Sequence, residues 1–439
     1  MQTIPVVKND KKILFLILNT WSNDSNGIFD YSSTAIKKIK AFIPESTYVV
    51  RTKNNLFNNI EQHADIQTKD GDDLLFYVNN SKNDTYILMN PIPKNLKLKE
   101  DNVEYLNNKM WYVLRTINPD SADNNNNDCN EEYYLNENDI IKIGRMKYNV
   151  NKIYIKSRDN NNSNEAEPPM PVAKINYDIS ELNKKNNKPV FEFDYLVKNE
   201  NYSEYIDINE KNSTGQIKTD DECRYEKYLE KEYINQETDD GENFLIRLCK
   251  CEKKVHFKCL KSYIKQNQAK REIEGGTYDE NWIFKFFGCS ECNRQFPTKF
   301  KLENQNKIFN LIDIKEPEES DCDYMILETL DYKQNDDYCK SIHIIKFTKD
   351  VITIGRENDN DVIDTDISIS RHHALLKLKD GKICIQNISQ KFGTLVLIKD
   401  KINILDKKIY LQVGRTYIEA CLMDKKEFDE KIKEPKNEN

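Results

Sequence analysis

The chain has 439 residues, which is enough for about three domains of ordinary size. Its 74 acidic side chains outnumber its 66 basic ones, so the formal net charge is −8, and we do not expect the surface as a whole to bind nucleic acid or anionic lipid. The hydrophobic fraction is only 38%, but aromatic residues make up 10% of the chain. This composition is typical of folded modules joined by polar segments.

The first part of the chain alternates short apolar runs with Asn- and Asp-rich turns, which predicts a β-rich domain over residues 1–156. Ile13–Leu18 is too short to cross a bilayer, and no cleavage site of small residues follows it. We therefore interpret it as a buried strand and expect neither a signal peptide nor membrane insertion. Residues 157–221 are polar and contain Pro168-Pro169-Met170-Pro171, which predicts a linker.

Six of the eleven cysteines fall in the short stretch from Cys223 to Cys292. Clustered thiols in a chain without a signal are more often metal ligands in a reducing compartment, so we expect a cytoplasmic protein, with nuclear or cytoskeletal association left open. Zinc needs four nitrogen or sulfur ligands, and short Cys-x-Cys or Cys-x2-Cys pairs supply two each. Eight candidate ligands follow one another here: Cys223, Glu226, Cys249, Cys251, His256, Cys259, Cys289 and Cys292.

This spacing, with the stretches Cys259–Ile264 and Cys289–Phe296, resembles the RING-variant (RING-CH) zinc finger of ubiquitin ligases, over residues 222–300. The resemblance implies two Zn²⁺ sites in a cross-brace. One would hold Cys249, Cys251, Cys289 and Cys292, and the other Cys223, Glu226, His256 and Cys259. Glu226 replaces a cysteine of the family, and carboxylates seldom serve in structural zinc sites, so we expect its site to be the weaker one.

Two alternatives stay open for this finger. The four residues between Cys251 and His256 form a spacing closer to that of a PHD finger. The RING-variant resemblance implies a ubiquitin-conjugating enzyme as partner, but Tyr225 and Tyr263 stand where that family has a small apolar residue and a Trp. A zinc-stabilised module without ligase activity is therefore the other interpretation.

Residues 301–323 connect the finger to a C-terminal region, 324–424, in which short strands and turns alternate; a charged tail, 425–439, follows. This alternation predicts an all-β sandwich. Three blocks of residues occur in it in order: Gly355-Arg356, Ser370-Arg371-His372-His373-Ala374 and Gly393-Thr394. Together they resemble the forkhead-associated (FHA) domain, a β-sandwich whose loops at one end bind phosphothreonine peptides.

The resemblance implies roles for these residues. A phosphate dianion is bound well by a guanidinium, a hydroxyl and backbone N–H groups, which the resemblance assigns to Arg356, Ser370 and the loops around them. The other residues implied at the peptide are Arg371, Lys391, Gly393 and Thr394, while Gly355 and His373 would be structural. Phe392 stands beside Gly393, where the family commonly has an Asn that clamps the peptide backbone. Selectivity beyond the phosphate is therefore not implied, and a sandwich kept only as a scaffold is the alternative.

The first 155 residues carry a weak copy of the same pattern. When Arg51 is matched to Arg356, His63 and Thr85 match His373 and Thr394, and the sequence Ile143-Gly144-Arg145 parallels Val413-Gly414-Arg415. These matches predict a degenerate FHA-like sandwich. No phosphate pocket is expected in it, because Ile60 and Glu61 stand in place of Ser370 and Arg371.

The sequence therefore predicts a mainly β protein with a β-rich N-terminal domain, a small α+β zinc finger and a C-terminal FHA sandwich. This arrangement resembles FHA–zinc finger proteins of ciliates and related protists. Our leading hypothesis is an intracellular adaptor that binds a phosphothreonine-containing protein. The alternatives are a ubiquitin ligase with phosphorylation-dependent substrates, and a structural component of a large assembly with inactive pockets.

Overall fold

The structure is a computed structural model, and the chain folds mainly into β-strands. No helix among the described residues is long and apolar enough to span a bilayer. The residues described are 12–21, 29–31, 33, 36–52, 59–63, 73–80, 86–90, 106, 108–114, 131–156, 204–206, 245–246, 255–271, 279–289, 291, 295–302, 308–313, 315–318, 322–330, 332–334, 337–399, 401–405 and 408–433.

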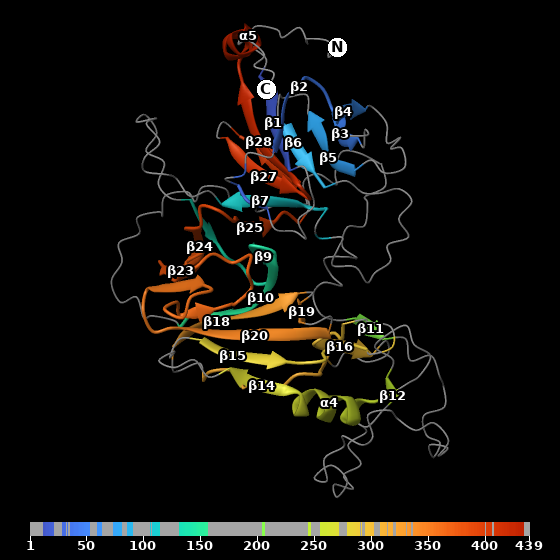
Figure 1. The fold of residues 1–439 in the computed structure, drawn as a ribbon, viewed down its shortest axis with the longest axis vertical. Helices are drawn as coiled ribbons and strands as arrows, with labels where there is room; N and C mark the ends of the chain where they lie inside the picture. The colour runs from blue at the N-terminus through green and yellow to red at the C-terminus, as the bar shows by residue number, and fades with distance from the viewer. Residues whose placement is uncertain are drawn as a thin grey trace, which may run out of the picture.

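One long sheet runs through the molecule, and among the described residues it has 13 strands (Figure 1). Strand β19 (Tyr332–Gln334) pairs with β20 outside the main path. The others lie side by side in the order β14 (Gln268–Arg271), β15 (Asp279–Phe284), β20 (Asp337–Phe347), β18 (Asp323–Leu330), β10 (Met146–Tyr154), β9 (Ile140–Ile143), β25 (Thr394–Leu397), β7 (Met110–Leu114), β27 (Ile409–Val413), β28 (Thr416–Met423), β1 (Ile13–Trp21) and β2 (Ile36–Ile43).

Two five-stranded sheets, counted over the described residues, pack against this long sheet. The first has the order β22 (Val362–Ile363), β21 (Val351–Gly355), β23 (Ala374–Lys379), β24 (Lys382–Asn387) and β8 (Glu132–Tyr134). The second has the order β26 (Lys401–Ile404), β6 (Tyr86–Met89), β5 (Asp73–Asn80), β3 (Thr47–Thr52) and β4 (Asn59–His63).

The molecule thus contains two β-sandwiches, which share the long sheet. We call the first the C-terminal sandwich: β22, β21, β23, β24 and β8 face β20, β18, β10, β9 and β25. The second is the N-terminal sandwich: β26, β6, β5, β3 and β4 face β7, β27, β28, β1 and β2. Buried side chains of both belong to one hydrophobic core, for example Ile354 and Val150 of the C-terminal sandwich and Phe76 and Leu16 of the N-terminal one.

The two sandwiches have the same strand order, but each takes its last three strands from the other end of the chain. In the long sheet, β20-β18-β10-β9-β25 corresponds to β2-β1-β28-β27-β7, and in the small sheets β8 corresponds to β26. Strands β8 to β10 follow the N-terminal strands in sequence, yet they complete the C-terminal sandwich. Strands β26 to β28 follow β25, yet they complete the N-terminal one.

The exchanged hairpins are alike in their turns. Gly144 between β9 and β10 has φ +62°, and Gly414 between β27 and β28 has φ +52°. Positive φ is readily adopted by glycine, so the repeated Gly-Arg pair of the sequence marks two equivalent tight turns. Register partners confirm where each hairpin lies, since Leu18 of β1 pairs with Ile418 and Leu327 of β18 pairs with Val150. Strand pairing therefore crosses the boundary between the predicted domains 1–156 and 324–424.

Two details of the predicted repeat need correction. His63 lies on β4, where it pairs with Tyr48 of β3, whereas His373 directly precedes β23, which pairs with the opposite side of β21. The strand of the N-terminal sandwich that corresponds to β23 is β5. Thr85 precedes β6, the counterpart of β24, whereas Thr394 begins β25, the counterpart of β7. Matching by the spacing along the sequence therefore aligned segments that occupy different places in the two sandwiches.

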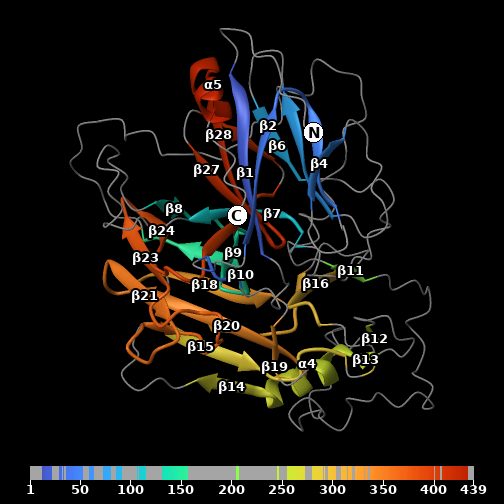
Figure 2. The same ribbon diagram turned by 45° about the horizontal axis from the view of Figure 1, so that its top comes forward.

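Helix α4 and the hairpin β14–β15, from the central part of the chain, pack on the outer face and edge of the C-terminal sandwich (Figure 2). Helix α4 (Phe257–Gln266) buries Phe257, Leu260 and Ile264, which recur at the helical period and share a core with Phe284 of β15 and Ile326 of β18. Strand β15 also pairs with β20. The predicted finger 222–300 therefore contains a hairpin, β14–β15, that extends the long sheet.

The remaining elements are short. Strand β12 (Leu245–Ile246) pairs with β13 (Val255–His256), and β11 (Glu204–Ile206), β16 (Lys299–Leu302) and β17 (Ile308–Asn310) form a small sheet. Helix α5 (Lys425–Lys433) occupies the first part of the segment predicted as a charged tail, and its Phe428 packs on Phe42 of β2.

Candidate phosphopeptide site

Three loops at one end of the C-terminal sandwich bring the FHA-like residues together. Strand β21 ends at Gly355, and the backbone N–H of Arg356 donates a 3.1 Å hydrogen bond to the carbonyl of Ser370. The N–H of the next residue, Glu357, donates to the carbonyl of Arg371. Two loops that are distant in sequence are thereby held side by side, with Arg356 and Ser370 at their contact.

Gly355 is required by this contact. A Cβ atom at Gly355 would lie 2.0 Å from the carbonyl oxygen of Arg371, a separation that real atoms do not show. The amide of Asn360 donates to the same carbonyl at 2.8 Å and to the carbonyl of Glu357 at 2.9 Å. The absence of a side chain at Gly355 lets the two loops meet, and Asn360 fastens them.

The Ser370 hydroxyl belongs to a short hydrogen-bonded chain. Its Oγ lies 2.6 Å from Oγ of Ser389, which in turn accepts a 3.1 Å hydrogen bond from the N–H of Phe392. A hydroxyl has one proton to donate and two lone pairs. If Ser389 donates to Ser370, the proton of Ser370 is directed outward, where it can meet an anionic oxygen.

His373 is fully buried and ties the loops from below. Its Nδ1 accepts a 2.9 Å hydrogen bond from the N–H of Ser370, and its Nε2 lies 3.3 Å from the carbonyl oxygen of Gly393. Since Nδ1 is the acceptor, Nε2 carries the proton of the neutral ring. Burial lowers the pKa of His373 to about 4, against a smaller opposite effect of the Gly393 carbonyl. His373 is thus a neutral, buried imidazole that supports the loops, which is the structural role that the FHA resemblance implies for it.

The cationic side chains lie on the surface. Arg356 is exposed, and among the described residues nothing forms a hydrogen bond or ion pair with its guanidinium. The Arg371 Nε lies 3.5 Å from a carboxylate oxygen of Glu357, and both side chains are largely exposed. Such surface pairs contribute at most about 1 kcal/mol, so a phosphate dianion can displace Glu357.

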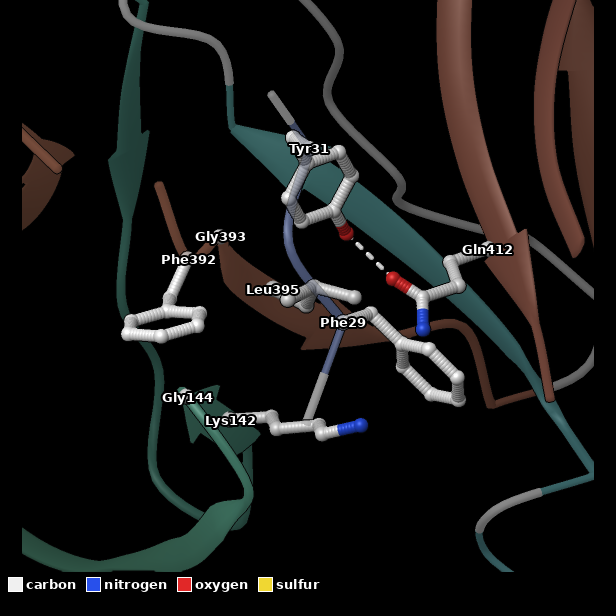
Figure 3. A pocket seen from close by; sticks show the side chains of 8 residues that line it. All are labelled: Phe29, Tyr31, Lys142, Gly144, Phe392, Gly393, Leu395 and Gln412. Atoms are coloured by element: carbon white, nitrogen blue, oxygen red, sulfur yellow. Dashed lines mark hydrogen bonds between the residues drawn. The ribbon is translucent and has the colours of Figure 1, made fainter. Parts of the chain in front are cut away.

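The third loop, residues 388–393 between β24 and β25, is held by the N-terminal part of the chain (Figure 3). The N–H of Tyr31 donates to the carbonyl of Lys391, and the Lys391 ammonium lies 3.3 Å from a carboxylate oxygen of Asp30. A Cβ at Gly393 would lie 2.9 Å from the Tyr31 ring. The Tyr31 hydroxyl donates to Gln412 of β27, in a small pocket between the sandwiches.

Two residues predicted at the peptide have a different role in this structure. Thr394 is fully buried and donates from its hydroxyl to Asn387 at 2.8 Å, and Gly393 is buried under Tyr31. Both support the loop from inside in this structure, and their contact with a peptide stays a prediction. Lys391 remains exposed at the edge of the loop.

The hairpin β9–β10, which comes from the N-terminal half of the chain, braces the loop 364–369 that leads to Ser370. The Arg145 guanidinium forms an ion pair with Asp366 at 2.8 Å, and its backbone N–H donates to the Ser368 hydroxyl at 2.9 Å. Burial alone would raise the pKa of Asp366, but hydrogen bonds from Arg145 and Ser368 outweigh it and lower the pKa. Tyr148 donates to Asp364 on the same loop. The carboxylates of this loop are thus occupied by partners from β9–β10.

Several supporting residues escaped sequence reasoning: Tyr31, Arg145, Asn360 and Ser389. Ser389 lies in the block that ends in Gly393-Thr394, and that was the signal that could have found it. Tyr31 and Arg145 act across hundreds of residues: no local pattern marks Tyr31, and the repeated Gly-Arg pair marks a turn at Arg145 without showing that its side chain reaches Asp366.

Comparison with known families supports the C-terminal site. The family model of the FHA domain matches residues 352–416, so the C-terminal region contains an FHA domain. The matched segment spans both sandwiches in the structure, because it includes β26 and β27, which lie in the N-terminal one. No curated protein matches the chain. An FHA domain indicates phosphothreonine-dependent protein binding.

The predicted zinc ligands are described only in part. His256 and Cys259 lie together, with Nδ1 and Sγ 3.9 Å apart, and Cys289 is buried in the same core as Cys259. No group of three potential metal ligands occurs among the described residues. The remaining predicted ligands lie outside the described residues: Cys223, Glu226, Cys249, Cys251 and Cys292.

Proposed function

We propose that this protein is an adaptor that binds a phosphothreonine-containing protein at the loops of its C-terminal sandwich. The observation that carries the proposal is the backbone contact between Arg356 and Ser370, which holds an exposed arginine next to a serine whose hydroxyl is hydrogen-bonded to Ser389. Charge-assisted hydrogen bonds from such a pair are the strong interactions available to a phosphate dianion. Arg371 adds a second cation within the same loop.

The test is binding of the full chain to a degenerate phosphothreonine peptide library by fluorescence anisotropy, with the unphosphorylated library as control. We expect phosphate-dependent binding that Arg356→Ala weakens by about tenfold or more, since a hydrogen bond to a charged group contributes about 1.5–3 kcal/mol. Lys382→Ala is the matched variant: it removes an exposed cation at the far end of strand β24 and should bind like wild type. Equal binding of both libraries would contradict the proposal.

We also propose that the central region binds zinc, with His256 and Cys259 as two ligands of one site. Tetrahedral bonds of about 2.1 Å to nitrogen and 2.3 Å to sulfur place such atoms about 3.6 Å apart, close to the 3.9 Å observed. The cross-brace implied by the sequence requires two Zn²⁺ per chain in a metal analysis of the purified protein. A content of one would leave the Glu226 site empty and so contradict the assignment of His256 and Cys259, which belong to that site, and a content of zero would refute the finger.

Ubiquitin transfer by this finger, and a purely structural role in an assembly, stay as separate hypotheses. An autoubiquitination assay with a panel of conjugating enzymes tests the first, and absence of product across the panel would exclude it. The N-terminal sandwich we propose to be a diverged copy of the C-terminal one, since the two have the same strand order.

A further inference from the structure

The loop 388–393 rests on one aromatic side chain from outside the FHA segment. The family model matches residues 352–416, whereas Tyr31 lies between β1 and β2. Its backbone N–H donates a 2.9 Å hydrogen bond to the carbonyl of Lys391, and a Cβ at Gly393 would lie 2.9 Å from a carbon of its ring. The loop therefore lies directly against Tyr31 (Figure 3).

Tyr31 is itself fixed in the N-terminal sandwich. Its ring makes edge-to-face contacts with Trp21 of β1 and Tyr417 of β28, with ring centroids 5.2 Å and 5.4 Å apart. Its hydroxyl donates to the buried side chain of Gln412 of β27. The indole N–H of Trp21 donates to the carbonyl of Asp30 at 3.0 Å. Strands β1, β27 and β28 therefore position the segment that carries Tyr31.

The ring of Tyr31 holds the loop more firmly than the ion pair beside it. The Lys391 ammonium and an Asp30 carboxylate oxygen are 3.3 Å apart, but the two side chains are 59% and 31% exposed. Water and salt screen an ion pair with this exposure, so it contributes little. The contact of the ring with Gly393 is a close packing contact, which salt does not weaken.

A short path leads from this contact to the proposed phosphate site. The residue before Gly393 is Phe392, and its N–H donates a 3.1 Å hydrogen bond to Oγ of Ser389. The same Oγ lies 2.6 Å from Oγ of Ser370. If the loop moved away from Tyr31, Ser389 would move with it. The hydroxyl of Ser370 would then lose the partner that fixes its direction.

We infer that Tyr31 is a positioning residue for phosphopeptide binding, which acts by holding the loop 388–393 in the conformation that receives the peptide. This inference rests on the proposed function. A loop that is ordered before the peptide arrives loses less conformational entropy on binding, so loss of the Tyr31 contact lowers the affinity. By linkage, a bound phosphopeptide must in turn stabilise the contact between the loop and Tyr31.

The experiment is a double-mutant cycle on the full chain, with binding of the phosphothreonine peptide library measured by fluorescence anisotropy. We expect Tyr31→Ala to weaken phosphate-dependent binding by about tenfold, because the loop must then be ordered by the peptide. Gly393→Ala should weaken it by about the same factor, because the added Cβ collides with the ring. In the double variant this collision is absent, so we expect a total loss of about tenfold instead of about a hundredfold.

Two variants and a second measurement serve as controls. Tyr31→Phe keeps the ring and should bind within about twofold of wild type. Tyr77→Ala removes a half-buried ring of β5 that packs on Tyr48 in the small sheet of the N-terminal sandwich, and should leave the affinity unchanged where the protein is folded. Hydrogen exchange on wild type needs no variant: the phosphopeptide library should slow exchange of the Tyr31 amide, which is bonded to the loop.

The outcomes separate the two proposals. Losses that multiply in the double variant, or exchange of the Tyr31 amide that bound phosphopeptide does not slow, overturn the role of Tyr31 and leave the proposed function standing. An equal loss in Tyr31→Phe and Tyr31→Ala also overturns it, because the first variant keeps the ring. If Tyr31→Ala does not fold, the hydrogen exchange of wild type decides. Absence of phosphate-dependent binding in wild type overturns both proposals.

Discussion

The two sandwiches have the same strand order but use an arginine of corresponding sequence in opposite ways. In the N-terminal sandwich Arg51 lies within β3, is buried, and binds Asp73 at 2.7 Å and the Thr416 hydroxyl at 2.8 Å. In the C-terminal sandwich Arg356 follows the end of β21 and is exposed on a loop. An arginine that follows the end of a strand is exposed and accessible to a ligand, whereas an arginine inside the strand is bound by the sandwich itself.

The comparison also shows what the strand exchange does. Arg51 of β3 reaches Thr416 of β28, and Arg145 of the β9–β10 turn reaches Asp366. Each sandwich therefore uses an arginine to fasten a segment that comes from the other end of the chain. The phosphopeptide loops are assembled from both halves of the protein.

The largest expected effect is a disulfide cross-link that tests whether the two hairpins are exchanged between the sandwiches. Asn19 of β1 and Tyr417 of β28 are register partners, and Cα atoms of such partners lie about 4.5–5.5 Å apart, within the range of a disulfide. We expect the pair Asn19→Cys and Tyr417→Cys to cross-link completely under oxidising conditions, as mapped by mass spectrometry of the digested protein.

The matched control pairs Tyr417→Cys with Leu330→Cys on β18. Leu330 has Lys147 of β10 as its partner, the position that Tyr417 would occupy if each sandwich kept its own hairpin. We expect no cross-link in this variant. A Leu330–Tyr417 cross-link in place of the Asn19–Tyr417 one would show that the strands are not exchanged.

The next effect concerns acid stability and depends on the buried His373. His373 has a pKa of about 4 in the folded protein and about 6.5 when unfolded, so the unfolded chain binds more protons between these values. Stability should therefore fall as the pH is lowered from about 6.5 to 4, by up to about 3 kcal/mol from this residue.

Urea unfolding of wild type and His373→Gln at pH 7.5 and pH 4.5 measures this contribution. The variant should be less stable at neutral pH but should lose less on acidification. Equal acid-induced losses in wild type and His373→Gln would contradict a buried neutral imidazole.

A smaller effect distinguishes the two arginines. Arg51→Met should destabilise the protein by about 2 kcal/mol, because it leaves Thr416 without its charged donor and Asp73, half-exposed, without its cation. Arg356→Met should change stability by less than about 0.5 kcal/mol, as is usual at exposed positions.

Phosphopeptide affinity should show the reverse order for the same two variants. Arg356→Met should lose binding, whereas Arg51→Met should retain it at temperatures where the protein is folded. Urea unfolding and anisotropy on the same samples give both values. Loss of stability in Arg356→Met would place this residue in the scaffold.

Much of the site could be predicted from the sequence, because its parts are local. Gly355, Arg356, Ser370 and His373 act through contacts between adjacent turns, and such turns demand particular residues whatever surrounds them. The direction of the Thr394 side chain could not be predicted in this way: its position in the motif is next to the loop, but its side chain is buried and bonds to Asn387. Sequence position identifies the loop, not the direction of each side chain.

The sequence by itself determined a mainly β protein with an FHA domain in its C-terminal region, and it predicted the loops that the structure brings together at one end of that sandwich. Only the tertiary structure decided which hairpin completes which sandwich. Hairpins 140–154 and 409–423 both join apolar strands through a Gly-Arg turn, so local pattern cannot choose between them. The choice is made by packing and by contacts such as Arg145 with Asp366 and Arg51 with Thr416, which exist only when the whole chain has folded.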